Sequence, residues 1–149
     1  MKKLLLALLI SYSLTSYSQG FNGNQMEIIK TINIAYAEGL QNEGDSSKID
    51  AGFHPDFYLL GKGDEKALRK LAIADWRARQ LKNKAIGKLP RKSENKVSLK
   101  YSFIDITGDV AVAKVDYYEG VQKTYIDYIS LYRYESGWRI ISKIYQKMD

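Results

Sequence analysis

Residues 97–147, VSLKYSFIDITGDVAVAKVDYYEGVQKTYIDYISLYRYESGWRIISKIYQK, decide the fold of this chain. Apolar and polar side chains alternate along most of the stretch, which is the period of a half-buried β-strand. Two-residue turn signals, Gly108-Asp109 and Ser136-Gly137, and a third turn around Gly120 divide it into segments. We therefore predict four strands, over about 97–107, 110–119, 123–135 and 138–147, each paired antiparallel with the next.

The chain before residue 97 shows helical spacing instead. Residues 25–40 predict a first helix, and Asp45 or Ser46 can cap a short second helix that runs through Ile49 to Phe53. A short strand is predicted over 56–60, and Asp64 can cap a long helix over 65–82. This order predicts an α+β fold, with helices covering one face of a curved antiparallel sheet. The predicted inward residues are Met26, Ile29, Asn33, Tyr36 and Leu40 in the first helix and Ala67, Leu71, Ala74, Ala78 and Leu81 in the long one.

The first 18 residues have the order of a signal peptide. A basic start at 1–3 precedes the apolar run 4–10, and Ser16 and Ser18 supply small residues at −3 and −1 before Gln19. The apolar run is too short to anchor the chain in a bilayer, and no later segment predicts a membrane span. We expect export to a periplasm or outside the cell, with cleavage near Ser18/Gln19 leaving a single domain over 19–149.

Composition excludes several kinds of site. The chain has no Cys and one His, His54, so we predict no disulfide, no metal site and no cofactor. The formal charge of +6 is a local property, because residues 62–100 carry 13 basic and 4 acidic side chains. No aromatic residues interleave the basic run 77–92, so we expect no nucleic-acid partner. The run is either a solvated helix end and loop or a surface for an acidic partner.

Successive side chains of a strand point to opposite faces of the sheet. If each turn contains an even number of residues, this alternation continues from one strand to the next, and two faces can be assigned. One face mixes large aliphatic residues, a tryptophan and two carboxylates, which favours a concave ligand pocket. The other is rich in Tyr and Ala, which favours a homodimer interface, although half-exposed strand tyrosines are the alternative. The predicted pocket residues are Tyr36, His54, Tyr101, Phe103, Asp116, Tyr118, Tyr125, Asp127 and Trp138, and the predicted dimer-face residues are Ala113, Tyr117, Tyr128, Tyr132, Lys143 and Tyr145.

The order of several short motifs resembles the nuclear transport factor 2-like (NTF2-like) superfamily and, more narrowly, its exported bacterial putative lumazine-binding group. They are Tyr36 with Gly39 and Asp45, then FHPDF at 53–57, GDVA at 108–111 and GWRI at 137–140. The resemblance covers about 25–147. It implies a cone-shaped, cystatin-like α+β barrel with three N-terminal helices, a strongly bent sheet, a pocket in the cone and frequent dimerisation.

The resemblance does not fix an activity, because the superfamily includes isomerases, dehydratases, cyclases and transport adaptors. Its ketosteroid isomerase branch has a tyrosine on the first helix that matches Tyr36. The general-base aspartate of that branch falls eight residues after the phenylalanine that matches Phe53. Gly61 stands at that position here, which argues against the isomerase mechanism.

We predict an exported, non-catalytic, dimeric domain that binds a small molecule. Asp116 and Asp127 would hold a cationic or donor-rich ligand stacked on Tyr or Trp, with Trp76 forming either a pocket wall or a dimer contact. The alternative is an isomerase or dehydratase that uses one of these aspartates as a base, which requires a buried carboxylate within hydrogen-bond reach of a tyrosine hydroxyl. A third possibility is a protein-interaction module that acts through the basic segment 77–92.

Overall fold

The structure is a computed structural model that describes residues 20–149. A long helical arm forms the first part of this range. It consists of α1 (Gly23–Ile32) and the π-helical η1 (Asn33–Glu43), which continue one another. A capping box starts α1, because the Asn22 side chain accepts from the Gln25 N–H at 3.0 Å and the Gln25 side chain accepts from the Asn22 N–H at 2.9 Å. The predicted signal peptide, residues 1–18, lies outside the described residues.

The arm ends at a sharp turn into α2 (Ser46–Gly52). Gly44 takes the left-handed conformation that closes η1, with φ of 59°. The Asp45 side chain accepts from the Lys48 N–H at 3.1 Å, so the predicted cap of the second helix is confirmed. Strand β1 (Phe53–Gly61) follows directly and starts three residues before the strand predicted over 56–60.

The next segment differs from the predicted helix over 65–82. Arg69–Ala72 forms strand β2, which pairs antiparallel with β1, and α3 begins only at Ile73 and ends at Ala85. Ile73 and Gln80 of α3 are buried, and Trp76 packs against the core. The predicted stripe is therefore wrong, because Ala74, Ala78 and Leu81 face outward. A short 3-10 turn, η2 (Ser93–Asn95), leads into the meander.

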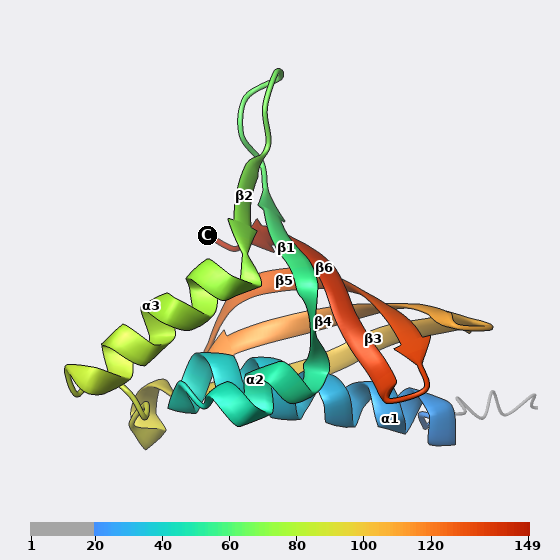
Figure 1. Cartoon of the computed structure of the whole chain (residues 1–149), viewed down its shortest axis with the longest axis horizontal. Coiled ribbons are helices and arrows are strands. Elements are labelled where there is room, and N and C mark those ends of the chain that lie inside the picture. The colour runs from blue at the N-terminus through green and yellow to red at the C-terminus, as the bar shows by residue number, and fades with distance from the viewer. Residues whose placement is uncertain (1–19) are drawn as a thin grey trace, which may run out of the picture.

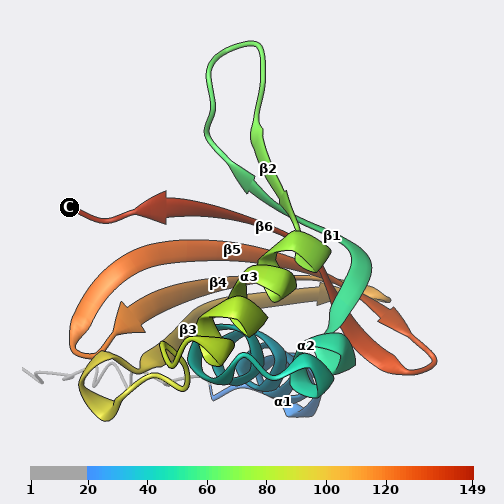
Figure 2. The same ribbon diagram turned by 60° about the vertical axis from the view of Figure 1, so that its left-hand side comes forward.

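The four predicted C-terminal strands are present as β3 (Val97–Thr107), β4 (Val110–Glu119), β5 (Gln122–Tyr134) and β6 (Gly137–Lys147). With β1 and β2 they form one sheet of order β2-β1-β6-β5-β4-β3. The sheet is mixed, since β1 runs parallel to β6, and it is open at β2 and β3. Figures 1 and 2 show it arching over α1 and α2, with α3 beside β1 and the β1–β2 hairpin projecting away from the body.

The fold is thus the predicted α+β architecture, a curved sheet over helices, although it is not a closed barrel. None of the helices within residues 20–149 is long and apolar enough to cross a membrane. Nor does that part of the chain contain a cluster of three or more potential metal-ligating side chains.

Bulges in three strands decide which side chains face the helices. Ser102 in β3, Thr124 in β5 and Ile141 in β6 each have no partner in the ladder, so the side-chain parity reverses at each of them. The faces predicted from uninterrupted parity are therefore wrong in part. The residues on the inner side are Val97, Leu99, Tyr101, Ile104, Ala111, Ala113, Val115, Tyr117, Tyr125, Asp127, Ile129, Leu131, Trp138, Ile140, Lys143 and Tyr145.

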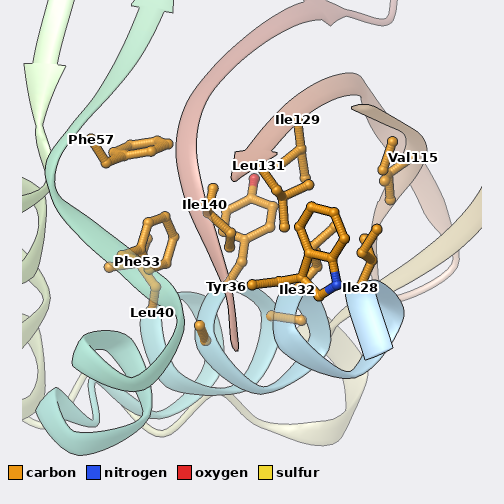
Figure 3. Packing of buried hydrophobic residues seen from close by; sticks show 14 of the residues in the cluster. Ile28, Ile32, Tyr36, Leu40, Phe53, Phe57, Val115, Ile129, Leu131 and Ile140 are labelled. Atoms are coloured by element: carbon orange, nitrogen blue, oxygen red, sulfur yellow. The ribbon is translucent and has the colours of Figure 1, made fainter. Parts of the chain in front are cut away.

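The core lies between this inner face and the helical arm (Figure 3). Ile28, Ile32, Tyr36 and Leu40, at a spacing of four, form the buried stripe of the arm. The prediction is confirmed for Tyr36 and Leu40, and Ile29 packs at the edge of the core, but Met26 is 51% exposed and is not part of the stripe. Tyr36 differs from its neighbours in the stripe because it carries a hydroxyl into the core. That hydroxyl is hydrogen-bonded to two buried charged side chains, Asp127 and Lys143.

Candidate functional site

A buried ion pair and a tyrosine hydroxyl meet at one end of the core. Lys143 Nζ on β6 lies 2.8 Å from Asp127 Oδ1 on β5 and donates to Tyr36 Oη at 2.8 Å. The Tyr36 hydroxyl donates to the second oxygen, Asp127 Oδ2, at 2.9 Å. Asp127 is 0% exposed, Tyr36 2% and Lys143 6%. Each of the three polar groups is therefore bonded to the other two, as expected of buried polar groups.

Two local irregularities bring these three residues together. The bulge at Ile141 turns Lys143 and Tyr145 to the inner face, where Tyr145 is paired with Asp127 across β5 and β6. The other irregularity is the π-helical winding of η1, the segment that carries Tyr36. In Figure 3 the Tyr36 oxygen points away from the helix toward the strands.

A pocket of about 210 Å³ opens beside the cluster. Its aromatic rings form a chain of edge-on and tilted contacts, with ring centroids 6.0 Å apart for Tyr36 and Trp76 and 5.5 Å apart for Tyr117 and Tyr125. The lining residues are Tyr36, Gln41, Leu59, Trp76, Tyr117, Glu119, Tyr125, Lys143 and Tyr145. The pocket is lined largely by aromatic rings and carries two charged side chains, Lys143 and Glu119.

The aromatic rings also surround the lysine. Lys143 Nζ lies 4.9 Å from the ring centroid of Tyr36, 5.3 Å from that of Tyr145 and 5.8 Å from that of Trp76. At such distances the negative ring faces attract an ammonium group. We call these three rings the aromatic cage, and the Lys143 ammonium group occupies it.

Burial controls the protonation of the site. It lowers the pKa of Lys143, while the neighbouring Asp127 carboxylate acts in the opposite direction. Burial and the Asp127 charge raise the pKa of Tyr36 well above its ordinary value. Burial likewise raises the pKa of Tyr117 and of Tyr125. These hydroxyls therefore stay protonated at neutral pH and can serve as hydrogen-bond donors.

A second, larger groove of about 550 Å³ lies outside the core, between α2, β1, α3 and the β5–β6 turn. Its charged groups already have protein partners. Arg77 Nη1 lies 2.7 Å from both Asp50 oxygens, and Arg139 donates to the Asp50 and Ala51 carbonyls. Because this groove has no buried charged group, we take the smaller pocket at Lys143 as the candidate site.

Comparison with known proteins gives the family. The family model described as "Putative lumazine-binding" matches residues 24–146, which is most of the chain. The chain belongs to the Putative lumazine-binding family. No curated protein matches it.

Solved structures of other proteins, several of them named NTF2-like or cystatin-like, resemble this Putative lumazine-binding chain in fold. An NTF2-like protein of unknown function from Silicibacter pomeroyi DSS-3 is 18% identical with a TM-score of 0.63, over 83% of this chain and 95% of the other. One from Shewanella baltica OS155, also of unknown function, is 21% identical with a TM-score of 0.61, over 87% and 99%. A cystatin-like domain of unknown function from Nostoc punctiforme PCC 73102 is 11% identical with a TM-score of 0.57, over 87% and 80%. At these identities the likeness concerns the fold alone.

Three of the predicted pocket residues meet at the site of this family member. Tyr36 and Tyr125 line the pocket, and Asp127 lies directly behind it, bonded to Tyr36 and Lys143. Tyr101 is inward but belongs to the α1 side, where its hydroxyl donates to Asn33 Oδ1 at 2.8 Å. Burial raises the pKa of Tyr101 also.

The remaining predicted pocket residues lie elsewhere. Trp138 is buried beneath the helices near α2, and His54 lies in the larger groove, where its ring stacks on Tyr134. Phe103, Asp116 and Tyr118 face the outer side of the sheet. These placements correct the expected grouping of the nine residues into one pocket.

The expected pair of carboxylates is also wrong. Asp116 is opposite Ile126, and the bulge at Thr124 turns Asp127 to the other face. Asp116 instead pairs with Lys123 at 2.9 Å at the partly exposed outer surface. The partner of Asp127 is therefore a lysine, not a second acid.

The predicted dimer face divides in the same way. Tyr128 and Tyr132 lie on the outer face and are 41% and 43% exposed. Ala113, Tyr117, Lys143 and Tyr145 face inward, and three of them line the pocket. Lys143 thus has the wrong predicted location but a central place in the site. No feature of the sequence around Ile141 indicated the bulge that turns it inward.

The basic segment 77–92 is partly engaged within the protein. Arg77 pairs with Asp50, and Arg91 donates to the Gln41 carbonyl at 3.0 Å and lies 3.4 Å from Glu119. Its role toward an acidic partner stays a prediction.

Proposed function

We propose that this chain is an exported small-molecule-binding domain whose ligand occupies the aromatic pocket beside Lys143. The observation that carries the proposal is the buried cluster of Lys143, Asp127 and Tyr36 at the end of a 210 Å³ pocket. A buried ion pair often stabilises a fold no more than apolar side chains of similar volume do. Charged groups kept at such a place, next to a pocket, are therefore typical of a functional site.

The lining residues define the class of ligand. Trp76, Tyr117 and Tyr125 offer ring faces and edges to a flat ring, and the volume lies below that of drug-sized sites. Because Lys143 already fills the aromatic cage, a second cation is disfavoured there. This modifies the expectation of a cationic ligand. We propose a small planar ring with a carbonyl or another acceptor oxygen directed at Lys143.

The family description suggests lumazine, a bicyclic ring that carries carbonyl groups, as the probe. Calorimetric titration of the protein with lumazine should give saturable binding at one site. Trp76→Phe should weaken binding by about two- to tenfold, since an aromatic contact contributes about 0.5–1.5 kcal/mol. Trp138→Phe is the matched control, because Trp138 is buried away from this pocket. Equal affinities for the wild type and Trp76→Phe would contradict the proposed site.

A catalytic role is a second candidate, because one of its structural requirements is met. Asp127 is a fully buried carboxylate with a tyrosine hydroxyl at 2.9 Å. Both of its oxygens are bonded within the protein, however, and it does not line the pocket. Asp127 is therefore better suited to position Lys143 and Tyr36 than to remove a proton from a substrate.

We also propose that the outer face of the sheet forms a homodimer. Phe103, Lys114, Tyr128 and Ile144 lie in one row across β3, β4, β5 and β6, and three of these side chains are large, apolar or aromatic, and exposed. Such a contiguous patch is typical of a protein interface. Ile144→Glu should shift the protein from dimer to monomer in sedimentation equilibrium, whereas Met26→Glu, at an equally exposed position on α1, should not. A monomeric wild type would contradict the proposal.

Export through residues 1–18 belongs to the same proposal. The N-terminus of the protein recovered from the producing cell should begin at Gln19. Recovery of the intact N-terminus from the cytoplasm would contradict it.

A further inference from the structure

We propose that Lys143 is a covalent capture residue, whose amine forms an imine with the carbonyl carbon of a small aromatic aldehyde or ketone in the pocket. The inference rests on the proposed ligand pocket and names both the class of ligand and the way it is held. Three features carry it: the position of Nζ, the groups that can move protons around it, and the shape of the space in front of it.

The amine lies where a ligand in the pocket would meet it. Lys143 lines the pocket although its side chain is only 7% exposed, so access to Nζ is through the pocket. Its two hydrogen bonds, to Tyr36 and Asp127, use two of the three N–H groups of an ammonium. The third N–H has no protein partner among the described residues. The amine is thus held in one orientation with one position available.

Proton carriers surround the amine at hydrogen-bond distance. The Asp127 carboxylate can accept the proton that the ammonium must lose before it attacks, at 2.8 Å. The Tyr36 hydroxyl is bonded to both Lys143 and Asp127, so it connects the proton acceptor to the pocket. Burial lowers the pKa of Lys143, which favours the neutral amine.

The step balances without any further reactant. The amine nitrogen bonds to the carbonyl carbon to give a carbinolamine, the C–O bond then breaks, and the oxygen leaves as water with two hydrogens that came from the ammonium. The product is a protonated imine that carries the remaining N–H. Its positive charge replaces that of the ammonium and stays paired with Asp127, so no charge is left unpaired in the interior. No oxidation or reduction takes place.

The space in front of Lys143 suits an aromatic carbonyl compound. Trp76 and Tyr145 both lie within 6 Å of Nζ, so a ring attached at the new C=N bond would contact aromatic walls. Glu119 is the acidic side chain that lines the pocket, and Arg91 lies 3.4 Å from it. Because the charge of Glu119 is paired with that of Arg91, and that of Lys143 with Asp127, the described pocket residues offer no free charge for a charged ring, and a neutral ring suits the pocket best.

The test traps the imine by reduction. The purified protein is incubated at neutral pH with benzaldehyde and sodium cyanoborohydride, and the benzylated lysines are located by peptide mapping and mass spectrometry. Lys147, exposed on the same strand, is the internal standard. Lys143 should carry at least about ten times more label than Lys147, because the pocket holds the aldehyde next to the amine. Equal or lower labelling of Lys143 in the wild type would overturn the proposal.

Two further measurements separate this inference from the proposed function. Lys143→Arg keeps the charge but cannot form an imine, so it should lose the selective label, while Lys147 should be labelled as in the wild type. Benzyl alcohol, which has no carbonyl, should bind to the pocket in calorimetry and reduce the labelling of Lys143. If lumazine or benzyl alcohol binds while Lys143 is labelled no more than Lys147, the imine is wrong and the binding site stands. If neither compound binds and no selective label forms, both proposals fall.

Discussion

The buried pair makes a sharp prediction for Asp127→Asn. This change keeps the shape of the side chain but leaves the Lys143 ammonium without its counter-charge at a position that is 6% exposed. Removal of one partner from a buried ion pair costs about 3–5 kcal/mol of unfolding free energy. With an m-value of about 2 kcal/mol/M for a domain of this size, the urea midpoint should fall by about 1.5–2.5 M.

The loss should depend on pH in a defined direction. The charge of Asp127 raises the pKa of Lys143 in the folded protein, so its removal moves that pKa further below 10.5. Between the folded pKa and 10.5 the unfolded chain binds more protons than the folded one, so stability rises with pH. The deficit of Asp127→Asn should therefore shrink as pH rises. Measurements should stop at about pH 9, where most unfolded tyrosines, with an ordinary pKa of about 10, are still protonated.

Asp116→Asn is the matched control, because this aspartate lies on the neighbouring strand and also pairs with a lysine, Lys123. That pair is partly exposed, so the loss should stay below about 1 kcal/mol. Chemical unfolding followed by circular dichroism measures both variants over the pH range. Two results would contradict the prediction: a loss of unfolding free energy in Asp127→Asn no larger than that in Asp116→Asn, or a loss that does not change with pH. Either result would show that the Lys143–Asp127 pair is solvated and would refute the reasoning.

Two other substitutions test the helical arm. Asn42→Ala should lower the unfolding free energy by about 2–3 kcal/mol in urea titration, because the buried Asn42 amide bonds both the N–H and the C=O of Val97 at 2.8 and 3.0 Å. A loss below about 0.5 kcal/mol would mean that water replaces the amide. Gly52→Ala should cost about 1–3 kcal/mol in thermal unfolding, since the new Cβ would collide with the Ala35 side chain. An unchanged melting temperature would show that α2 can move away from the arm.

The sheet was largely predictable from the sequence because its signals are local. The alternation of side chains and the Gly108 and Gly137 turns define each of the four C-terminal strands to within about a residue. The β2 segment was not predictable in this way. Arg69–Ala72 consists of residues that favour helices, and it is a strand because it pairs with β1, a contact that no local pattern reveals.

The site was predictable only in part, for a reason that lies in the bulges. Tyr36, Tyr125 and Asp127 were expected in the pocket, and they lie at the site. Lys143 was expected on the opposite face because one unpaired residue, Ile141, reverses the parity of β6 beyond it. A single extra residue leaves the alternation on either side intact, so the sequence shows two regular segments and conceals the shift between them.

The position of the charged pair argues for a function. A Leu and a Met at positions 127 and 143 would fill similar volume, and such replacements of buried ion pairs are often neutral or stabilising by about 1–4 kcal/mol. Stability therefore gives no reason to keep a lysine and an aspartate there. The pair is also not needed to orient the strands on the helical arm. The bulge at Ile141, the strand register and the Ile28–Leu40 stripe already do so. What the pair provides, and an apolar pair would not, is an oriented amine at the end of an aromatic pocket.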